Sequence, residues 1–152
     1  MPSSAPRAAA KQPCCTPKKH NISYVFQEPT CLPWRTVREN VAYGMEVKGV
    51  GKEEREARAT QIMDLVGLSS CADLYPNQVS ASMMQRIAVS RAFAVNPDLL
   101  LMDEPYGQLD VKLRFYLEDE LVNIWKKLNS TVLFVTHNME EAVYVAERIL
   151  VL

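Results

Sequence analysis

Three short apolar runs in this chain each end in a pair of polar residues, and this pattern constrains the fold more than any other feature. The runs and the pairs that follow them are Tyr24–Phe26 before Gln27-Glu28, Leu99–Met102 before Asp103-Glu104, and Val132–Val135 before Thr136-His137. Such runs, rich in β-branched and aromatic residues, are typical of parallel strands that are buried on both faces. The stretches between them have the helical periodicity that crossovers between parallel strands require. The sequence therefore predicts an α/β fold with a parallel sheet.

The polar pairs predict a functional edge of that sheet. In open parallel sheets, ligands bind beyond the carboxyl ends of the strands. If the three runs are neighbours, the side chains that emerge together are those of Gln27, Asp103, Glu104 and His137. An amide, two carboxylates and an imidazole could surround a polyanion and its metal ion, which suits phosphoryl chemistry. Alternatively, the acids are ordinary solvated strand ends, Gln27 belongs to a surface turn and His137 is structural.

Charge and composition exclude several classes of protein. The 152 residues suffice for one hydrophobic core, and the formal net charge is -1. Because the first twenty residues hold four basic and no acidic side chains, residues 21–152 carry -5, which argues against a nucleic-acid surface there. No stretch approaches the roughly 18 apolar residues of a membrane span, so a membrane role would require a partner. The four cysteines lack paired C-x-x-C spacing, which favours reduced thiols in a cytosolic protein.

Residues 1–20 differ in composition from the rest of the chain. They are rich in Pro, Ala, Ser and Lys, and apart from Met1 they contain no aliphatic side chain larger than alanine. Such a segment cannot bury enough apolar surface to fold, so we expect it to be disordered. It is either a short basic transit peptide or unrelated sequence created by a truncated start.

Turn and capping signals place the expected helices. Thr36 and Glu39 form a capping box that opens a helix to about Val47, and a charged helix over residues 52–66 stops at Gly67. Ser80 is the expected N-cap of a helix that ends at Asn96-Pro97. From residue 98 onward we expect strand, turn, helix (about 111–128), strand, helix (about 139–146) and strand.

Four blocks resemble one known family. In order, they are YVFQEPTCLPWRTVRENV, YPNQVSASMMQRIAVSRAF, LLLMDEPYGQLD and TVLFVTHNMEEAVYVAERILVL. From about Asn21 to Leu152 the chain resembles the ATP-binding subunit of an ATP-binding cassette (ABC) importer of the nitrate, sulfonate and taurine type. The resemblance implies a P-loop NTPase-like fold with a helical subdomain at about residues 36–96. The family's G-x-x-x-x-G-K-[ST] loop is not found in the sequence, so we expect a partial domain without its N-terminal part, preceded by a non-family leader over residues 1–20.

The resemblance assigns roles to the residues at the strand ends. Asp103 corresponds to the Walker B aspartate that holds Mg²⁺, and Gln27 to the Q-loop residue that ligates the same ion. Glu104 and His137 correspond to the catalytic glutamate and the switch histidine, which orient the attacking water and contact the γ-phosphate. The implied cofactors are ATP and Mg²⁺.

Two further segments resemble parts of the family that contact the nucleotide of a partner subunit. Residues 79–86 align with the signature at a helix start, which makes Ser80, Ala81, Ser82 and Gln85 candidate nucleotide-binding residues. The family has two glycines where this chain has Ala81 and Ser82, and the added Cβ atoms would obstruct close backbone approach. Asp110, in the Gly107–Asp110 turn, resembles the dimer-contacting D-loop residue.

The function that the resemblance implies is ATP hydrolysis coupled to import of a small anion such as nitrate, sulfonate or taurine. The implied partners are a membrane permease and a second ABC ATPase subunit, on the cytoplasmic, inner face of the cell membrane. Leu32 and Trp34 are candidates for the permease contact, or else belong to a local core. Without a phosphate-binding loop we expect no autonomous ATP hydrolysis. The alternatives are a non-catalytic partner subunit and a truncated, non-functional gene product.

Overall fold

The computed structural model describes residues 21–107, 114–115, 118–119, 122 and 131–151. In chain order its elements are β1 (Ile22–Val25), α1 (Val37–Val47), α2 (Lys52–Leu65), η1 (Ser69–Cys71), η2 (Pro76–Gln78), α3 (Ala81–Ala94), β2 (Leu99–Asp103), β3 (Thr131–Val135) and α5 (Met139–Val145). The predicted leader over residues 1–20 and the candidate residue Asp110 lie outside the described residues. Most of the helix expected at about 111–128 also lies outside them.

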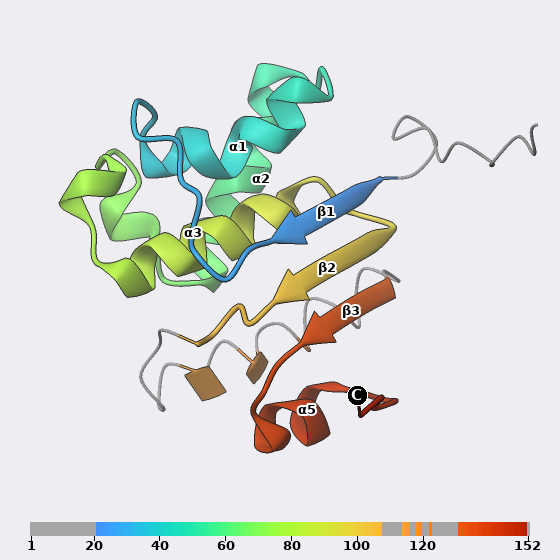
Figure 1. Cartoon of the computed structure of the whole chain (residues 1–152). Coiled ribbons are helices and arrows are strands. Elements are labelled where there is room, and N and C mark those ends of the chain that lie inside the picture. Colours follow the sequence, from blue (N-terminus) through green and yellow to red (C-terminus); the bar gives the residue numbers. More distant parts are fainter. Residues whose placement is uncertain (1–20, 108–113, 116–117, 120–121, 123–130, 152) are drawn as a thin grey trace, which may run out of the picture.

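The three strands form one parallel sheet in the order β1-β2-β3. Tyr24 is in register with Leu101, and Leu101 with Leu133. All three strands therefore end at the same edge, as Figure 1 shows. Helices α1, α2 and α3 lie together beside β1, and α5 lies next to β3 (Figure 1). The predicted α/β fold with a parallel sheet and a helical insertion after the first strand is confirmed.

The helices begin and end where local side chains satisfy the backbone. In α1 the Thr36 hydroxyl accepts from Glu39 N at 3.3 Å, and the Glu39 carboxylate accepts from Thr36 N at 2.9 Å, so the expected capping box forms. Helix α2 ends before Gly67, whose φ of 67° is in the left-handed region that favours glycine. Ser80 caps α3.

A continuous apolar core holds the three helices together. Its fully enclosed side chains come from α1, α2, α3 and the turn around η1, and include Val37, Val41, Met45, Ala59, Met63, Leu68, Cys71 and Ile87. The one buried polar side chain of α1, Asn40, accepts from Leu32 N at 2.8 Å and donates to three carbonyls, those of Leu32, Arg35 and Thr36. These bonds fasten the segment after β1 to α1 and compensate for the burial of the amide.

The two faces of the sheet differ, which corrects the prediction that the strands are buried on both faces. On the inner face Val25, Leu100 and Met102 are enclosed with side chains of α3 and α5. On the outer face, apolar side chains remain open to solvent: Ile22 is 50% exposed, Tyr24 43%, Leu133 58% and Val135 52%. The apolar runs correctly predicted the strands. They do not by themselves predict whether helices pack against both faces of the sheet.

The last expected strand, after α5, is not formed. Residues 146–151 have no strand conformation, and Ile149, Leu150 and Val151 are exposed. A strand needs a neighbour to satisfy its backbone groups, and in the described part of the chain β3 has a paired neighbour only in β2. The apolar composition of this segment was therefore not sufficient for strand formation.

Candidate functional site

The ends of all three strands contribute to one group of hydrogen-bonded side chains. Glu104, directly after β2, is at its centre: Gln27 Nε2 donates to Glu104 Oε2 at 2.9 Å, and His137 Nδ1 lies 2.8 Å from Glu104 Oε1. Gln27 follows β1 and His137 follows β3. The structure thus brings together three of the four strand-end residues that the sequence predicts, and each carboxylate oxygen of Glu104 faces a different strand.

The backbone of Glu104 has a conformation that the sequence does not reveal. Its φ of 43° is in the left-handed region, where a residue with a Cβ pays about 1–3 kcal/mol. Glu104 N donates to Val135 O at 2.9 Å, and Gly107 N donates to Glu104 O at 3.2 Å. These bonds hold the turn that directs the carboxylate towards Gln27 and His137. Strain of this kind concentrates at functional sites.

Asp103 lies one residue earlier, on the outer face of the sheet, and has a different partner. The Tyr24 hydroxyl donates to Asp103 Oδ2 at 3.4 Å. Desolvation, and then the negative charge of Asp103, raise the pKa of Tyr24, so the phenol keeps its proton and remains a donor. Sequence reasoning missed Tyr24. The signal was available, because strand alternation puts Tyr24 and Asp103 on the same face of neighbouring strands.

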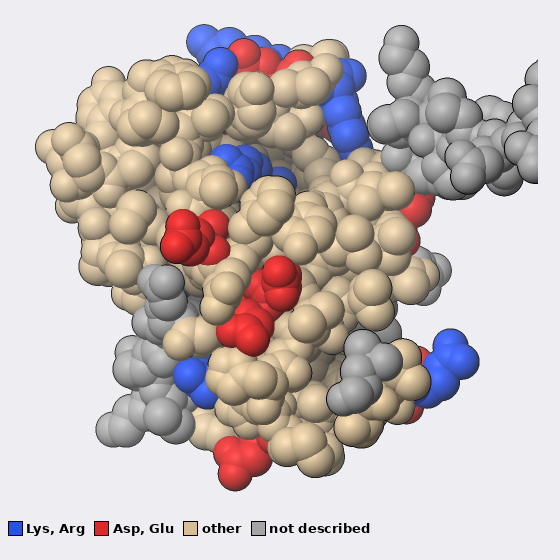
Figure 2. Space-filling view, in the orientation of Figure 1, with Lys and Arg blue, Asp and Glu red and all other residues tan. Residues whose placement is uncertain are grey.

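The donor atoms at this edge fit a magnesium ion. Figure 2 shows acidic side chains within a largely uncharged surface, in the region where the strands end in Figure 1. Mg²⁺ prefers oxygen ligands and is usually held by one or two carboxylates together with substrate phosphates. Asp103 offers a partly exposed carboxylate, and Gln27, whose amide nitrogen is bonded to Glu104, offers its amide oxygen. Among the residues described, no set of three or more His, Cys, Asp or Glu side chains could hold a metal by itself, so phosphate oxygens would have to complete the coordination.

The candidate signature residues form a second, separate group. Ser80 Oγ accepts from Met83 N at 3.3 Å and lies 3.0 Å from Ser82 Oγ, while Ala81 is exposed at the first position of α3. Because α3 runs antiparallel to the strands, its N-terminus lies on the side where the strands end (Figure 1). The contacts of Ser80 are nevertheless with its own helix start. The structure does not join this group to Glu104.

Gln85, the remaining signature candidate, is inside the protein. Its side chain is buried, and its amide nitrogen donates to the carbonyl of Pro105. This bond links α3 to the turn that follows Glu104. The described structure therefore places Gln85 between the two groups and does not present its side chain to an external ligand.

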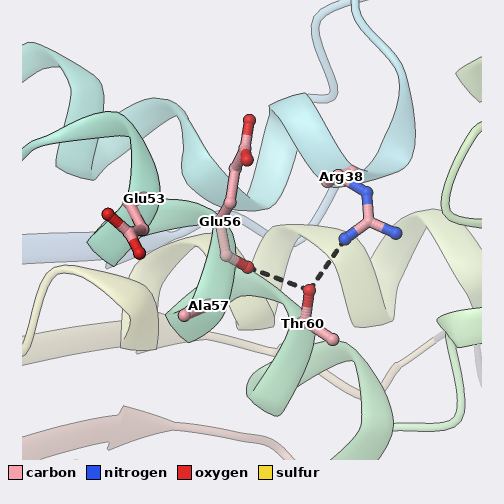
Figure 3. Close-up of a pocket in the computed structure, with 5 residues that line it drawn as sticks. All are labelled: Arg38, Glu53, Glu56, Ala57 and Thr60. Atoms are coloured by element: carbon pink, nitrogen blue, oxygen red, sulfur yellow. Dashed lines mark hydrogen bonds between the residues drawn. The ribbon is translucent and has the colours of Figure 1, made fainter.

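A surface pocket lies elsewhere, between α1 and α2. It is lined by Arg38, Glu53, Glu56, Ala57 and Thr60 (Figure 3). Thr60 Oγ1 donates to Glu56 O at 2.9 Å and accepts from Arg38 Nη1 at 2.8 Å, so the hydroxyl in this pocket is already bonded within the protein. None of the site residues expected from the sequence lines this pocket.

The two residues considered for a permease contact differ in exposure. Trp34 is 71% exposed, whereas Leu32 is half-buried and its backbone is bonded to Asn40. An exposed tryptophan of this kind is a common anchor at protein interfaces. Of the helices that the structure describes, none has the length and apolar character needed to cross a bilayer.

The fold and the strand-end group together define a class of protein. A parallel sheet whose carboxyl edge gathers an amide, two carboxylates and an imidazole, with a helical insertion after the first strand, is typical of P-loop-type ATPase domains. The sequence profile of the ABC transporter family matches residues 6–107. The chain therefore belongs to the ABC transporter family.

Within this family, the chain is similar to several individual ATP-binding proteins. The chain is 48% identical over 128 residues to an uncharacterized ABC transporter ATP-binding protein of Methanocaldococcus jannaschii, and 45% identical over 128 residues to a taurine import ATP-binding protein of Rhizobium johnstonii. It is 41% identical over 128 residues to a nitrate import ATP-binding protein of Synechocystis. Each alignment covers 84% of this chain, and 48%, 49% and 48% of the respective relatives. The chain thus spans about half the length of the curated relatives it matches.

Proposed function

We propose that this chain supplies the hydrolytic edge of an ABC importer ATP-binding subunit. The observation that carries the proposal is the convergence of Gln27 and His137 on the two carboxylate oxygens of Glu104, at 2.9 and 2.8 Å. A carboxylate held from both sides has a fixed direction, which a water-orienting base needs. A surface acid without such partners would rotate freely.

Each strand-end residue has a separate task in this proposal. Glu104 accepts a proton from the attacking water, and the His137 imidazole contacts the γ-phosphate and fixes the water against it. Asp103 and Gln27 would hold Mg²⁺, which neutralises charge developing on the phosphates when it is bound. Tyr24 keeps the Asp103 carboxylate oriented through its hydroxyl.

We assign the partners from the relatives and the exposed groups. Ser80 and the free amides at the start of α3 would face the nucleotide of a second ATP-binding subunit, with Asp110 in the same contact. Trp34 would contact a membrane permease, which would place the chain at the cytoplasmic face of the membrane. The names of the relatives point to small polar substrates such as taurine or nitrate.

A chimaera tests whether these residues support hydrolysis. The N-terminal part of the Rhizobium johnstonii taurine subunit, joined to residues 21–152 of this chain, should hydrolyse ATP in a magnesium-dependent reaction. Glu104→Gln should reduce phosphate release by about 10²–10⁴-fold, the usual contribution of a general base. Glu28→Gln, a charge-matched change of an exposed neighbour, should leave the rate unchanged. A folded chimaera without turnover would contradict the proposal.

The chain by itself should give no measurable phosphate release with excess ATP and magnesium. The reason is electrostatic: Asp103 and Glu104 bring negative charge to the site, and the G-x-x-x-x-G-K-[ST] motif that holds phosphates is not found in the sequence. Turnover by the chain alone that Glu104→Gln abolishes would refute this expectation.

A further inference from the structure

Glu141, on α5, is bonded to both neighbours of His137. Thr136 Oγ1 donates to Glu141 Oε2 at 2.7 Å, and Asn138 Nδ2 donates to Glu141 Oε1 at 3.3 Å. The Glu141 side chain is only 6% exposed. One buried carboxylate therefore holds the residue before His137 and the residue after it.

The segment around His137 is fixed by further bonds that depend on the same residues. Asn138 N donates to Thr136 Oγ1 at 3.0 Å, and Asn138 Oδ1 accepts from Glu140 N at 2.9 Å, which caps α5. The hydroxyl of Thr136 thus connects Glu141 to the backbone directly after His137. These contacts determine the direction in which the His137 Cα–Cβ bond leaves the chain.

Packing does little to hold the imidazole itself. The His137 side chain is 76% exposed, and its described polar contact is the one with Glu104 Oε1. A ring so open to water has no enclosing side chains to select its rotamer. The backbone that Thr136, Asn138 and Glu141 hold therefore sets the place from which the ring reaches Glu104, and the bond to Glu104 Oε1 then orients the ring.

The Glu141 site suits a carboxylate in particular. Its two oxygens face three donors, because Arg114 Nη1 lies 3.1 Å from Glu141 Oε1 in addition to the Thr136 and Asn138 bonds. A carboxylate can accept all three bonds, whereas a glutamine has one acceptor oxygen and an amide nitrogen that would face donors. The charge of Arg114 also compensates for the burial of the carboxylate.

We propose that Glu141 is a positioning residue for His137: its buried carboxylate holds Thr136 and Asn138 so that the imidazole is presented to Glu104. Glu141 does not reach the reacting atoms, and it acts only through the backbone of residues 136–138. Its consequence for ATP hydrolysis rests on the proposed function, but the positioning itself is a property of the chain alone.

The test is nuclear magnetic resonance of the full chain labelled at histidine. The sequence has only two histidines, so His137→Gln assigns the His137 signals unambiguously. In Glu141→Gln the ring signals of His137 should shift and broaden, because the imidazole loses its fixed direction. The matched control is Glu140→Gln, an exposed neighbour on the same helix, which should leave them unchanged. The methyl signals of Val145, buried on α5, report whether the helix still packs.

The outcomes separate positioning from general support of the fold. Altered His137 signals with unaltered Val145 signals support the proposal, and unaltered His137 signals in a folded Glu141→Gln chain overturn it. If Glu141→Gln disturbs Val145 as well, Thr136→Val decides, because it removes the hydroxyl that connects Glu141 to Asn138 N and leaves Glu141 itself in place. That variant should alter the His137 signals, and if it does not, the proposal is wrong. None of these signals depends on ATP, so a chimaera that fails to hydrolyse ATP would count against the proposed function and not against the positioning.

Discussion

The helical region and the sheet differ in how completely they bury their apolar side chains. Helices α1, α2 and α3 share an enclosed core, and the buried amide of Asn40 in α1 makes four hydrogen bonds. The sheet has one enclosed face and one face on which Ile22, Tyr24 and Leu133 are open to solvent. A helix satisfies its own backbone and needs cover for only one stripe, whereas a parallel strand needs neighbours at its edges and cover on both faces. The described elements therefore cover the core of the helical region, whereas they leave one face of the sheet open.

Leucine-to-alanine substitutions on the two faces of the sheet test whether the inner face is buried and the outer face is exposed. Leu100→Ala removes a fully enclosed side chain from the inner face and should cost about 2–5 kcal/mol of unfolding free energy. Leu133→Ala makes the same chemical change on the outer face and should cost about 0.5 kcal/mol or less, because water already reaches the side chain. Urea unfolding followed by circular dichroism measures both values. Equal losses at the two sites would mean that the outer face is covered in solution.

Much of the fold could be predicted because its signals are local. The capping box of Thr36 and Glu39 and the glycine stop at Gly67 act within a few residues, and the structure has both. The strands were also found, although β1 ends at Val25, one residue before the end of its apolar run. Cover on the outer face and pairing of residues 149–151 depend on other segments, so composition alone predicted them wrongly.

In the candidate site, too, some features could be predicted from the sequence and others depend on tertiary packing. The convergence of Gln27, Glu104 and His137 follows from a topological rule for parallel sheets and could be predicted without side-chain geometry. The positive φ of Glu104 and the burial of Gln85 could not, because they depend on how α3 packs against the turn after β2. Residue type gave the chemistry of the site, but only tertiary packing gave the direction of each group.

Glu118 provides a test of burial that depends on pH, because its side chain is both enclosed and ionisable. The residue is buried, and neither carboxyl oxygen has a hydrogen-bond partner among the described residues. Desolvation first, and then the charges of Glu141 and Asp119, raise the pKa of Glu118, while Arg114 lowers it. The folded chain therefore binds more protons than the unfolded one from about pH 4.3, the ordinary glutamate value, up to the raised pKa. Stability should fall as the pH rises through that window.

Glu118→Gln should remove this loss, because the amide never ionises. We expect a gain in stability at pH 7, where the parent chain must ionise a buried carboxyl or keep it protonated against the solvent, and no gain near pH 3, where both side chains are neutral. Glu147→Gln, the same chemical change at an exposed residue, is the control and should change little. Urea unfolding at a series of pH values gives both curves. A variant that is less stable than the parent at pH 7 would show that the carboxylate is ionised and paired in solution.

The open face of the sheet should make copies of the chain associate. Exposed apolar strands attract further chains, so we expect concentration-dependent oligomers in sedimentation velocity. Replacing both Ile22 and Leu133 by threonine keeps strand propensity but removes apolar surface, and should weaken association by about tenfold, or about 1.4 kcal/mol. The matched control replaces Val47 and Leu65, exposed apolar residues of the helical region, by threonine. Equal effects of the two pairs, or a parent chain that is monomeric throughout, would contradict the expectation.

The smallest expected effect concerns the start of α3, where the helical region meets the proposed partner. Restoring glycine at Ala81 and Ser82 should destabilise the chain by about 1 kcal/mol or less, because Ser80 still caps the helix through Met83 N. If the chain is a partner for an intact ATP-binding subunit, the glycines should also let phosphate approach the backbone and strengthen ATP-dependent association by about 1–3 kcal/mol. Binding to a hydrolysis-deficient intact subunit, measured with and without ATP, separates the two effects. Because loss of stability and gain of binding have opposite signs, a version that is slightly less stable yet binds more tightly with ATP can only reflect recognition at the helix start. Absence of nucleotide-dependent binding by either version would reject the partner role and leave α3 as a support of the core alone.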